Sequence, residues 1–387
     1  MLVRLHFFFC LLLLAPTFLR AQTTIRGTIR SGGLVRDYRL YVPRAYNGSR
    51  PVPLLLNLHG YGSNNSQQEQ YGDFRPIADT ANFLVVHPNG VLSGGTRSWN
   101  TFSAPGTGGP NDVAFLAALI DSISARYNVD ASRVYSTGMS NGGFMSYELA
   151  CQLSNRVAAI ASVTGSMIQS RLAVCRPTRA VPIMEIHGTA DNTVPYNGIG
   201  VIVSIPTLLA NWVQRNGCNP TPVITQVPDI NTTDGSTAER QVYSGGRNGS
   251  IVEHYRIIGG GHTWPGAPIS VGVTNRDINA SREIWRFLRP YRLSGLVAAV
   301  KEPTEATLLV SPNPVKELVT VQRGTGQPVL GQMSVLDALG RVVPATVRHA
   351  ADGSVQLSTA GWAPGIYWLR AEVAGKPVYR RLMKQAE

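Results

Sequence analysis

The sequence predicts an α/β fold with a mostly parallel central sheet, followed by a small all-β sandwich in the C-terminal part of the chain. Short segments that are almost entirely apolar, such as residues 52–59, precede segments of helical periodicity, such as residues 112–127. This alternation is typical of a parallel sheet that helices cover on both faces. From residue 307 onward, short β-rich segments are separated by Pro, Gly and Asn, which favours a sandwich.

The individual elements follow from these patterns in chain order. Residues 22–292 are predicted to form the α/β domain, residues 293–306 a linker and residues 307–387 the sandwich domain. The strands expected in the α/β domain are residues 35–42, 52–59, 83–88, 134–137, 157–163, 181–186 and 252–258. The helices expected there are residues 112–127, 143–150, 208–215 and 278–288. The strands expected in the sandwich are residues 306–310, 318–322, 333–337, 355–358 and 365–373.

The N-terminus has the features of a secretory signal peptide over residues 1–21. Arg4 precedes an apolar run at residues 7–14, and the small residue Ala21 marks the expected cleavage site. The run is too short to span a bilayer, and no other segment reads as a membrane span. We therefore expect a secreted protein without a stable membrane span.

The charge of the chain does not indicate a nucleic-acid partner. The 387 residues carry a formal net charge of +12. The basic residues are scattered along the sequence, and no RNA- or DNA-binding motif accompanies them. This pattern favours a solvated basic surface over a nucleic-acid interface.

Three cysteines remain after the signal peptide: Cys151, Cys175 and Cys218. Outside the cytoplasm, Cys151 and Cys175 can form a disulfide. The third thiol, Cys218, is then left without an explanation. No paired C-x-x-C spacing occurs, so the cysteines do not predict a zinc site, and we expect no metal.

The motif with the clearest chemistry is Gly138-Met139-Ser140-Asn141-Gly142, which reads G-x-S-x-G. A β-rich segment precedes it and a helical segment follows it. At such a turn a serine is held in a strained conformation with its hydroxyl exposed, and glycines allow the close approach of neighbouring backbone. The helix that follows directs N–H groups toward the same point. The motif therefore predicts that Ser140 is a nucleophile that attacks a carbonyl carbon.

A serine nucleophile needs a base and a residue that orients the base. Asp191 follows the apolar segment 181–186, and His262 lies in a glycine-rich loop after the segment 252–258. The order Ser, Asp, His is the one that this type of turn requires. Taken singly, such an Asp can be a turn residue and such a His can be solvated. His187 and His254 are the rival bases, but His187 precedes Asp191 and His254 falls within a predicted strand.

Two backbone N–H groups are expected to form the oxyanion hole: that of Asn141, directly after the nucleophile, and that of Tyr61, in the loop after the central strand. The alternative for this loop is that His59-Gly60 only shapes a turn. Trp99 and Trp264 are the candidate substrate-binding residues. For either tryptophan, ordinary packing is the competing interpretation.

Four segments together resemble the secreted polyhydroxybutyrate depolymerase and feruloyl esterase group (carbohydrate esterase family 1). They are residues 58–62, 138–143, 186–191 and 260–266. The resemblance covers roughly residues 25–290 and implies an α/β-hydrolase fold, no cofactor and hydrolysis of carboxylic esters, with Ser140, Asp191 and His262 at the triad positions. Relatives often carry a second cysteine that pairs with the one at Cys218. Residues 243–247 contain none, so this thiol is expected to be unpaired or its loop to be changed.

The C-terminal domain resembles the type A C-terminal sorting domain of the type IX secretion system. The resemblance rests on Leu309-Val310-Ser311-Pro312-Asn313-Pro314, on residues 336–341 and on residues 365–368. It implies export across an outer membrane, with the type IX secretion machinery as a partner. The alternative is a small carbohydrate-binding sandwich.

The sequence as a whole favours a secreted serine esterase. Its expected substrates are feruloyl or acetyl esters of plant polysaccharide, or a hydroxyalkanoate polyester. A serine peptidase on the same scaffold is one alternative. A non-catalytic, secreted polysaccharide-binding protein is another, although a binding protein has no need of all three triad residues.

Overall fold

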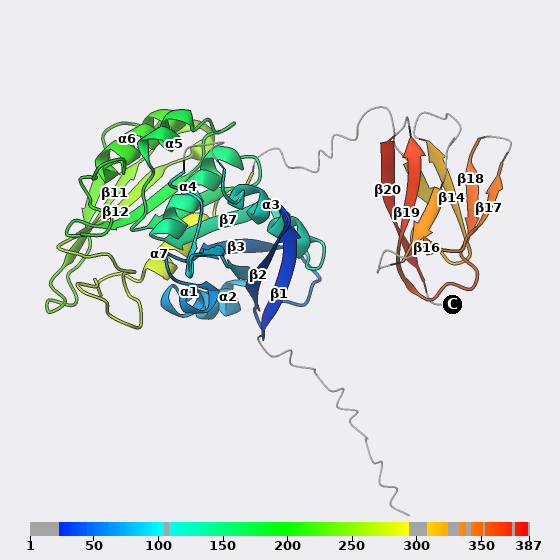
Figure 1. Ribbon diagram of the computed structural model, residues 1–387, viewed down its shortest axis with the longest axis horizontal. Helices are drawn as coiled ribbons and strands as arrows, with labels where there is room; N and C mark the ends of the chain where they lie inside the picture. The colour runs from blue at the N-terminus through cyan, green and yellow to red at the C-terminus, as the bar shows by residue number, and fades with distance from the viewer. Residues whose placement is uncertain are drawn as a thin grey trace, which may run out of the picture. The chain divides into compact units, whose positions relative to one another are not determined.

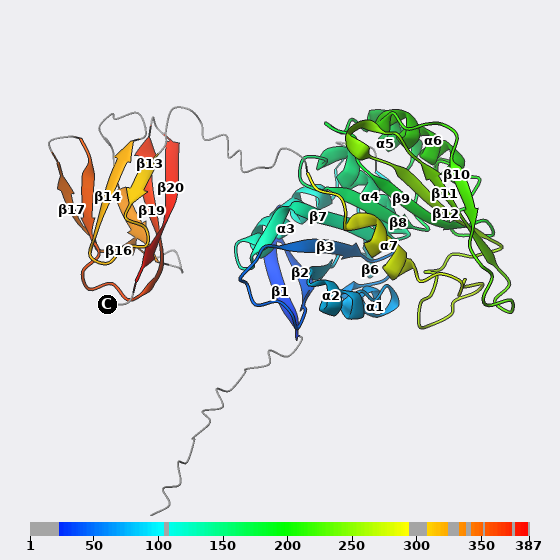
Figure 2. The same ribbon diagram turned by 180° about the vertical axis from the view of Figure 1, so that it is seen from behind.

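The computed structural model describes residues 23–103, 108–293, 308–323, 333–337, 342–350, 353–373 and 376–385. The chain divides into two compact units, residues 1–294 and 295–387, which Figures 1 and 2 show from opposite sides. The expected signal peptide and nearly all of the expected linker lie outside the described residues. Within the described residues, no helix combines the length and apolarity that a bilayer crossing requires.

The first unit is built on a ten-stranded sheet in the order β1-β2-β4-β3-β7-β8-β9-β12-β11-β10. The six strands from β4 to β12 in this order run parallel, while β1, β2, β11 and β10 pair antiparallel at the two edges. The strands are β1 (Thr23–Ser31), β2 (Leu34–Val42), β3 (Val52–Leu58), β4 (Leu84–Pro88), β7 (Val129–Met139), β8 (Ala159–Val163), β9 (Ile183–Gly188), β10 (Val223–Gln226), β11 (Thr237–Tyr243) and β12 (Val252–Ile258). A separate hairpin joins β5 (Val91–Ser93) to β6 (Thr96–Ser98).

Helices cover both faces of this sheet, which explains why its central strands are apolar throughout. In β3, Leu54 and Leu56 belong to the core on one face, together with residues of α3, α4 and α6, whereas Leu55 belongs to the core on the other face, together with residues of α7. The helices are α1 (Asn65–Tyr71), α2 (Arg75–Ala81), α3 (Asp112–Ser124), α4 (Asn141–Gln152), α5 (Gln169–Val174), α6 (Ile205–Asn216), α7 (Ala280–Leu288) and the short 3₁₀ turn η1 (Arg247–Gly249). The predicted α/β fold of hydrolase type is confirmed.

The second unit is an all-β sandwich, as the sequence predicts. One sheet has the order β13-β14-β18-β17 and the other has the order β16-β15-β19-β20. Apolar side chains from both sheets, including Val319, Val355 and Leu369, form one buried cluster. The strands are β13 (Leu308–Ser311), β14 (Leu318–Arg323), β15 (Met333–Leu336), β16 (Val342–Val343), β17 (Thr346–His349), β18 (Val355–Ser358), β19 (Gly365–Val373) and β20 (Lys376–Lys384).

A disulfide joins Cys151, in α4, to Cys175, directly after α5, with the two Cα atoms 5.1 Å apart. It ties the helix that begins beside Ser140 to the next helix in the chain. Cys218 is a free, buried thiol, and burial raises its pKa. The family that the sequence resembles often has a second cysteine that pairs at this position, and residues 243–247 contain none. The unpaired state of Cys218 agrees with that difference.

Candidate active site

Ser140 occupies a strained turn between β7 and α4. Its φ of 53° lies in the left-handed region, which non-glycine residues seldom adopt. The turn packs tightly against the end of β3: a Cβ atom at Gly138 would lie 2.6 Å from the Leu58 carbonyl oxygen, and one at Gly142 would overlap the same oxygen. Glycine is therefore required on both sides of the serine, which is the physical reason for the G-x-S-x-G spacing.

Asp191 and His262 are brought together at the same edge of the sheet as Ser140. The strands β7, β9 and β12 run parallel in one half of the sheet, so the loops that follow them meet at its carboxyl end. The Nδ1 atom of His262 lies 2.7 Å from Oδ2 of Asp191. The other oxygen of Asp191 accepts hydrogen bonds from the backbone N–H groups of Thr193, at 2.8 Å, and Val194, at 2.9 Å. The carboxylate is thus fixed from one side while it orients the imidazole on the other.

His262 and Ser140 line one cavity of about 360 Å³. Within the described residues, the Ser140 hydroxyl has no hydrogen-bond partner, so it is available to the imidazole or to a ligand. In ligand-free sites the hydrogen bond between nucleophile and base is often long, and it tightens when substrate binds.

The pKa of Asp191 is held below its usual range. Burial by itself raises the pKa of a carboxyl group, but hydrogen bonds from His187 and His262 outweigh this effect. Asp191 is therefore ionised across the pH range in which a histidine acts as a base. An ionised carboxylate at Nδ1 keeps the imidazole proton on that atom and leaves Nε2 free to accept one.

The two expected oxyanion donors belong to segments that adjoin the nucleophile. Asn141 begins α4 directly after Ser140, and a Cβ atom at Gly60 would lie 3.5 Å from Cβ of Ser140, which places the loop that carries Tyr61 against the nucleophile. In the part of the chain that the structure describes, neither the N–H of Asn141 nor that of Tyr61 donates to another protein group. Both N–H groups are thus free for an oxyanion.

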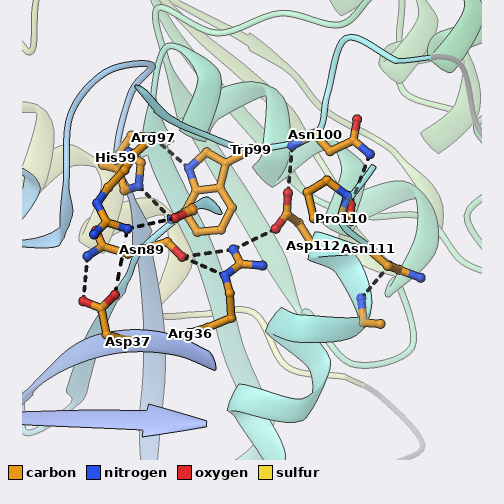
Figure 3. Close-up of polar contacts among 12 residues, drawn as sticks. Arg36, Asp37, His59, Asn89, Arg97, Trp99, Asn100, Pro110, Asn111 and Asp112 are labelled. Carbon is orange, nitrogen blue, oxygen red and sulfur yellow. Dashed lines mark hydrogen bonds and ion pairs between the residues drawn. The ribbon is translucent and has the colours of Figure 1, made fainter. Parts of the chain in front are cut away.

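A polar network surrounds His59, at the start of the loop that carries Tyr61, and Figure 3 shows His59 and Trp99 within it. His59 accepts a hydrogen bond at Nε2 from the N–H of Gly90, at 2.9 Å, and its Nδ1 lies 2.7 Å from the carbonyl oxygen of Gly60. Burial lowers the pKa of His59 to about 4, so its ring is neutral with the proton on Nδ1. His59-Gly60 therefore does more than shape a turn, because it anchors the loop to the segment after β4.

Trp99 lies in the middle of the same network. Its indole N–H donates to the carbonyl oxygen of His59, at 2.9 Å, and its backbone N–H donates to Oδ1 of Asn141, at 2.7 Å. Only 2% of the residue is exposed, but it contributes to the wall of a cavity beside Ser140. Trp99 thus combines the two roles that the sequence left open, packing and lining the site.

Trp264 has a different place from the one that the sequence suggests. Its ring is buried, its indole N–H donates to the hydroxyl of Ser281, at 3.2 Å, and its edge packs against Phe74 at a ring distance of 6.1 Å. It does not line either of the cavities beside Ser140. The chain turns into the core after His262, so proximity in sequence does not bring this side chain to the wall of either cavity. A substrate-binding role for Trp264 stays a prediction without support from this geometry.

The structure adds cavity residues that the sequence did not indicate. A cavity of about 540 Å³ beside Ser140 is lined mainly by apolar side chains. Phe102 and Phe144 form an aromatic pair in it, with ring centroids 5.1 Å apart. Phe144 lies one helical turn after Ser140, so its spacing from the nucleophile at the start of α4 was a usable signal for its place in the cavity wall. Phe102 lies on an irregular segment, and nothing in its local sequence indicates its role.

The rival bases are both buried behind the site. His187 lies with Nδ1 2.9 Å from Glu185 and Nε2 2.8 Å from the carbonyl oxygen of Val194. His254 lies with Nδ1 2.9 Å from the carbonyl oxygen of Glu185. Neither imidazole lines the cavities beside Ser140, so His262 is the histidine that shares a cavity with the nucleophile.

Among the described residues, no group of three or more His, Cys, Asp or Glu side chains could hold a metal ion.

Comparison with known proteins gives two family matches. Residues 36–212 match the family model described as Esterase PHB depolymerase. Residues 309–385 match the model described as Secretion system C-terminal sorting domain.

Three curated relatives illustrate the similarity. The chain is 28% identical over 278 residues to a bifunctional acetylxylan esterase/xylanase of Neocallimastix patriciarum, a match that covers 71% of this chain and 36% of that protein. It is 29% identical over 231 residues to feruloyl esterase B of Piromyces equi, covering 57% of this chain and 41% of that protein. It is 32% identical over 195 residues to feruloyl esterase C of Emericella nidulans, covering 49% and 64%. The chain spans less than two thirds of the length of each of these three relatives.

Proposed function

The chain belongs to the Esterase PHB depolymerase family through residues 36–212 and carries a secretion system C-terminal sorting domain at residues 309–385, and on this premise we propose that it is a secreted serine esterase. The observation that carries the proposal is the convergence of Ser140, Asp191 and His262 at one edge of the sheet, with the nucleophile and the base in one cavity. No cofactor takes part in the proposed chemistry.

In the first half of the reaction, Oγ of Ser140 attacks the acyl carbon of the ester while Nε2 of His262 takes the hydroxyl proton. The carbonyl oxygen becomes an oxyanion, which accepts hydrogen bonds from the N–H groups of Tyr61 and Asn141. The C–O bond of the ester then breaks, and His262 returns the proton to the departing alkoxide, so that a neutral alcohol leaves. Asp191 stays ionised and stabilises the imidazolium between these two steps.

In the second half, water takes the place of the alcohol. His262 removes a proton from the water as its oxygen attacks the acyl-enzyme, and the oxyanion forms again between the same two donors. When the bond between the acyl carbon and Ser140 breaks, His262 returns the proton to the serine. The products are the free acid and the regenerated enzyme.

The positions of the two cavities support one orientation of the substrate. The leaving alcohol receives its proton from His262, so it occupies the cavity of about 360 Å³, whose wall includes the polar side chains of Gln67 and Gln70. The acyl group then occupies the cavity of about 540 Å³ on the Phe102 and Phe144 side. An apolar, aromatic acyl site fits a feruloyl ester better than an acetyl ester, which leaves most of the larger cavity empty.

An ester panel tests this substrate class. Methyl ferulate, acetylated xylan, p-nitrophenyl acetate and polyhydroxybutyrate are compared by kcat/KM or, for the polymers, by the rate of acid release. Preference for methyl ferulate over the acetyl esters supports the proposal. Preference for polyhydroxybutyrate assigns the chain to polyester hydrolysis. Cleavage of a peptide substrate added to the panel, with none of the four esters hydrolysed, assigns it to peptide hydrolysis.

Phe102→Ala is expected to lower kcat/KM for methyl ferulate by about tenfold, because the aromatic acyl group loses a contact surface. The same variant is expected to leave kcat/KM for p-nitrophenyl acetate within about twofold of wild type. Leu92→Ala is the matched control, since Leu92 is also an exposed apolar residue but does not line the cavity. Equal losses on both esters in the Phe102 variant would contradict the placement of the acyl group.

We propose further that the protein is exported by the type IX secretion machinery. The signal-like residues 1–21 supply the first step in this proposal, and the C-terminal sorting domain supplies the second. In a bacterium that has this machinery, the full chain is expected outside the cells, whereas a chain ended after residue 306 is expected to stay in the periplasm. Equal release of the two chains, measured by immunoblot of the medium, would exclude a sorting role.

A further inference from the structure

Behind the proposed triad lies a second histidine that contacts the same aspartate. His187, at the end of β9, is fully buried, and its Nε2 atom lies 3.4 Å from Oδ2 of Asp191, the oxygen that also faces His262. On its other side, Nδ1 lies 2.9 Å from a carboxylate oxygen of Glu185. Four side chains therefore form a continuous row: Glu185, His187, Asp191 and His262.

The contacts of His187 favour its doubly protonated form. Nε2 lies 2.8 Å from the carbonyl oxygen of Val194, which can only accept a hydrogen bond. Nδ1 faces Glu185, whose other carboxylate oxygen accepts a hydrogen bond from the hydroxyl of Tyr147, at 2.8 Å. Burial opposes the charge, but hydrogen bonds to Asp191 and Glu185 outweigh it and raise the pKa of His187 to about 9. Burial raises the pKa of Glu185, and the contact with His187 counteracts that rise.

The other groups around His187 do not supply a competing charge at Asp191. His254, on β12, is buried and hydrogen-bonds to the hydroxyl of Tyr196, at 3.1 Å, and burial lowers its pKa to about 3. The ring of Tyr196 packs edge-on against His187 at 6.0 Å. Arg256, also on β12, forms an ion pair with Glu239 at 3.2 Å. On the buried side, His187 is thus the titratable group that contacts Asp191.

We propose that His187, held as an imidazolium by Glu185, is a positioning residue that fixes Asp191 from behind and tunes the proton affinity of His262. This inference rests on the proposed function. A positive charge behind Asp191 offsets part of the carboxylate's charge, which makes protonation of His262 less favourable. His262 is then available as a base at lower pH than an isolated His–Asp pair allows.

The first test is the pH profile of kcat/KM for the best ester of the panel. His187→Gln removes the charge but keeps a hydrogen-bond donor, so the acid limb of the profile is expected to move to higher pH by about one unit. Glu185→Gln removes the partner that holds the charge and is expected to move the limb in the same direction. If the two residues act as a unit, the double variant shifts the limb no further than His187→Gln does. KM is expected to stay near the wild-type value, since His187 lines neither cavity.

His254→Gln is the matched control. It replaces a second buried histidine that contacts Glu185 only through a backbone carbonyl and does not contact Asp191. Its acid limb is expected to coincide with that of the wild type. If the loss of any buried imidazole moved the acid limb through a structural effect, the limb would move in both His187→Gln and His254→Gln, and that result would overturn the proposal. An unshifted acid limb in His187→Gln would overturn it as well.

The second test does not depend on activity. The ¹⁵N NMR shifts of the wild-type histidine side chains at pH 7.5 report whether each ring is protonated on one nitrogen or on both, and the His187→Gln spectrum identifies the signals of His187. Protonation on both nitrogens supports the proposal, and a neutral ring overturns it. This measurement needs no substrate. If the protein hydrolyses no ester, the proposed function is refuted, but the charge of His187 is still decided by the NMR shifts alone.

Discussion

Ser140→Ala is expected to lower kcat for ester hydrolysis by about 10⁴- to 10⁶-fold while the fold stays intact. The reason is that Ser140 is the hydroxyl group in this cavity that lies on the strained turn before α4. The other serine there, Ser63, donates its hydroxyl to Oε1 of Gln67, at 2.9 Å, and the remaining side chains are amides, two phenols and apolar groups. The measurement is steady-state turnover of the ester that the panel identifies. A fluorophosphonate probe should label the wild type and leave the variant unlabelled.

Ser146→Ala is the control for this substitution. Ser146 lies on α4, the helix that begins directly after Ser140, but its hydroxyl is buried and contacts the hydroxyl of Ser136, at 2.9 Å, and the carbonyl oxygen of Gly142, at 3.1 Å. We expect its activity to stay within a few-fold of wild type. Near-normal hydrolysis by Ser140→Ala would remove the nucleophile assignment, whereas failure of the probe to label the wild type would favour a non-catalytic protein.

Asp191→Asn is expected to lower kcat by about 10⁴-fold, with the geometry of the loop largely kept. The side-chain oxygen of asparagine can still accept the N–H groups of Thr193 and Val194. The amide nitrogen then occupies the position that faces His262, where it donates to Nδ1. This forces the imidazole proton onto Nε2, the atom that must take the proton of Ser140.

Asp79→Asn provides the matched control for the Asp191 variant. Asp79 lies in α2 and accepts a hydrogen bond from the N–H of Arg44, at 3.1 Å. Its replacement is expected to leave kcat unchanged within about twofold. A loss of less than about tenfold in Asp191→Asn would show that another group orients His262.

Local signals in the sequence were sufficient to predict the main strands and to propose the catalytic residues. The central strands are buried on both faces, so their apolar runs are conspicuous, and β18 and β19 coincide with the predicted ranges. The outer strands β1 and β10 were missed because they lack such a signal: β10 is exposed along its whole length. Edge strands are defined by pairing with a neighbour, and a single segment does not reveal its neighbour.

The sequence by itself determined the nature of the proposed chemistry, because the G-x-S-x-G turn and the order of Ser140, Asp191 and His262 follow from short segments of chain. Only the tertiary structure decided what surrounds these residues. It placed Trp264 in the core, made Phe102 and Phe144 neighbours and put His187 behind Asp191. The physical reason is that a strand or turn is specified by residues close in sequence, whereas a cavity wall or a buried charge pair depends on how distant segments pack.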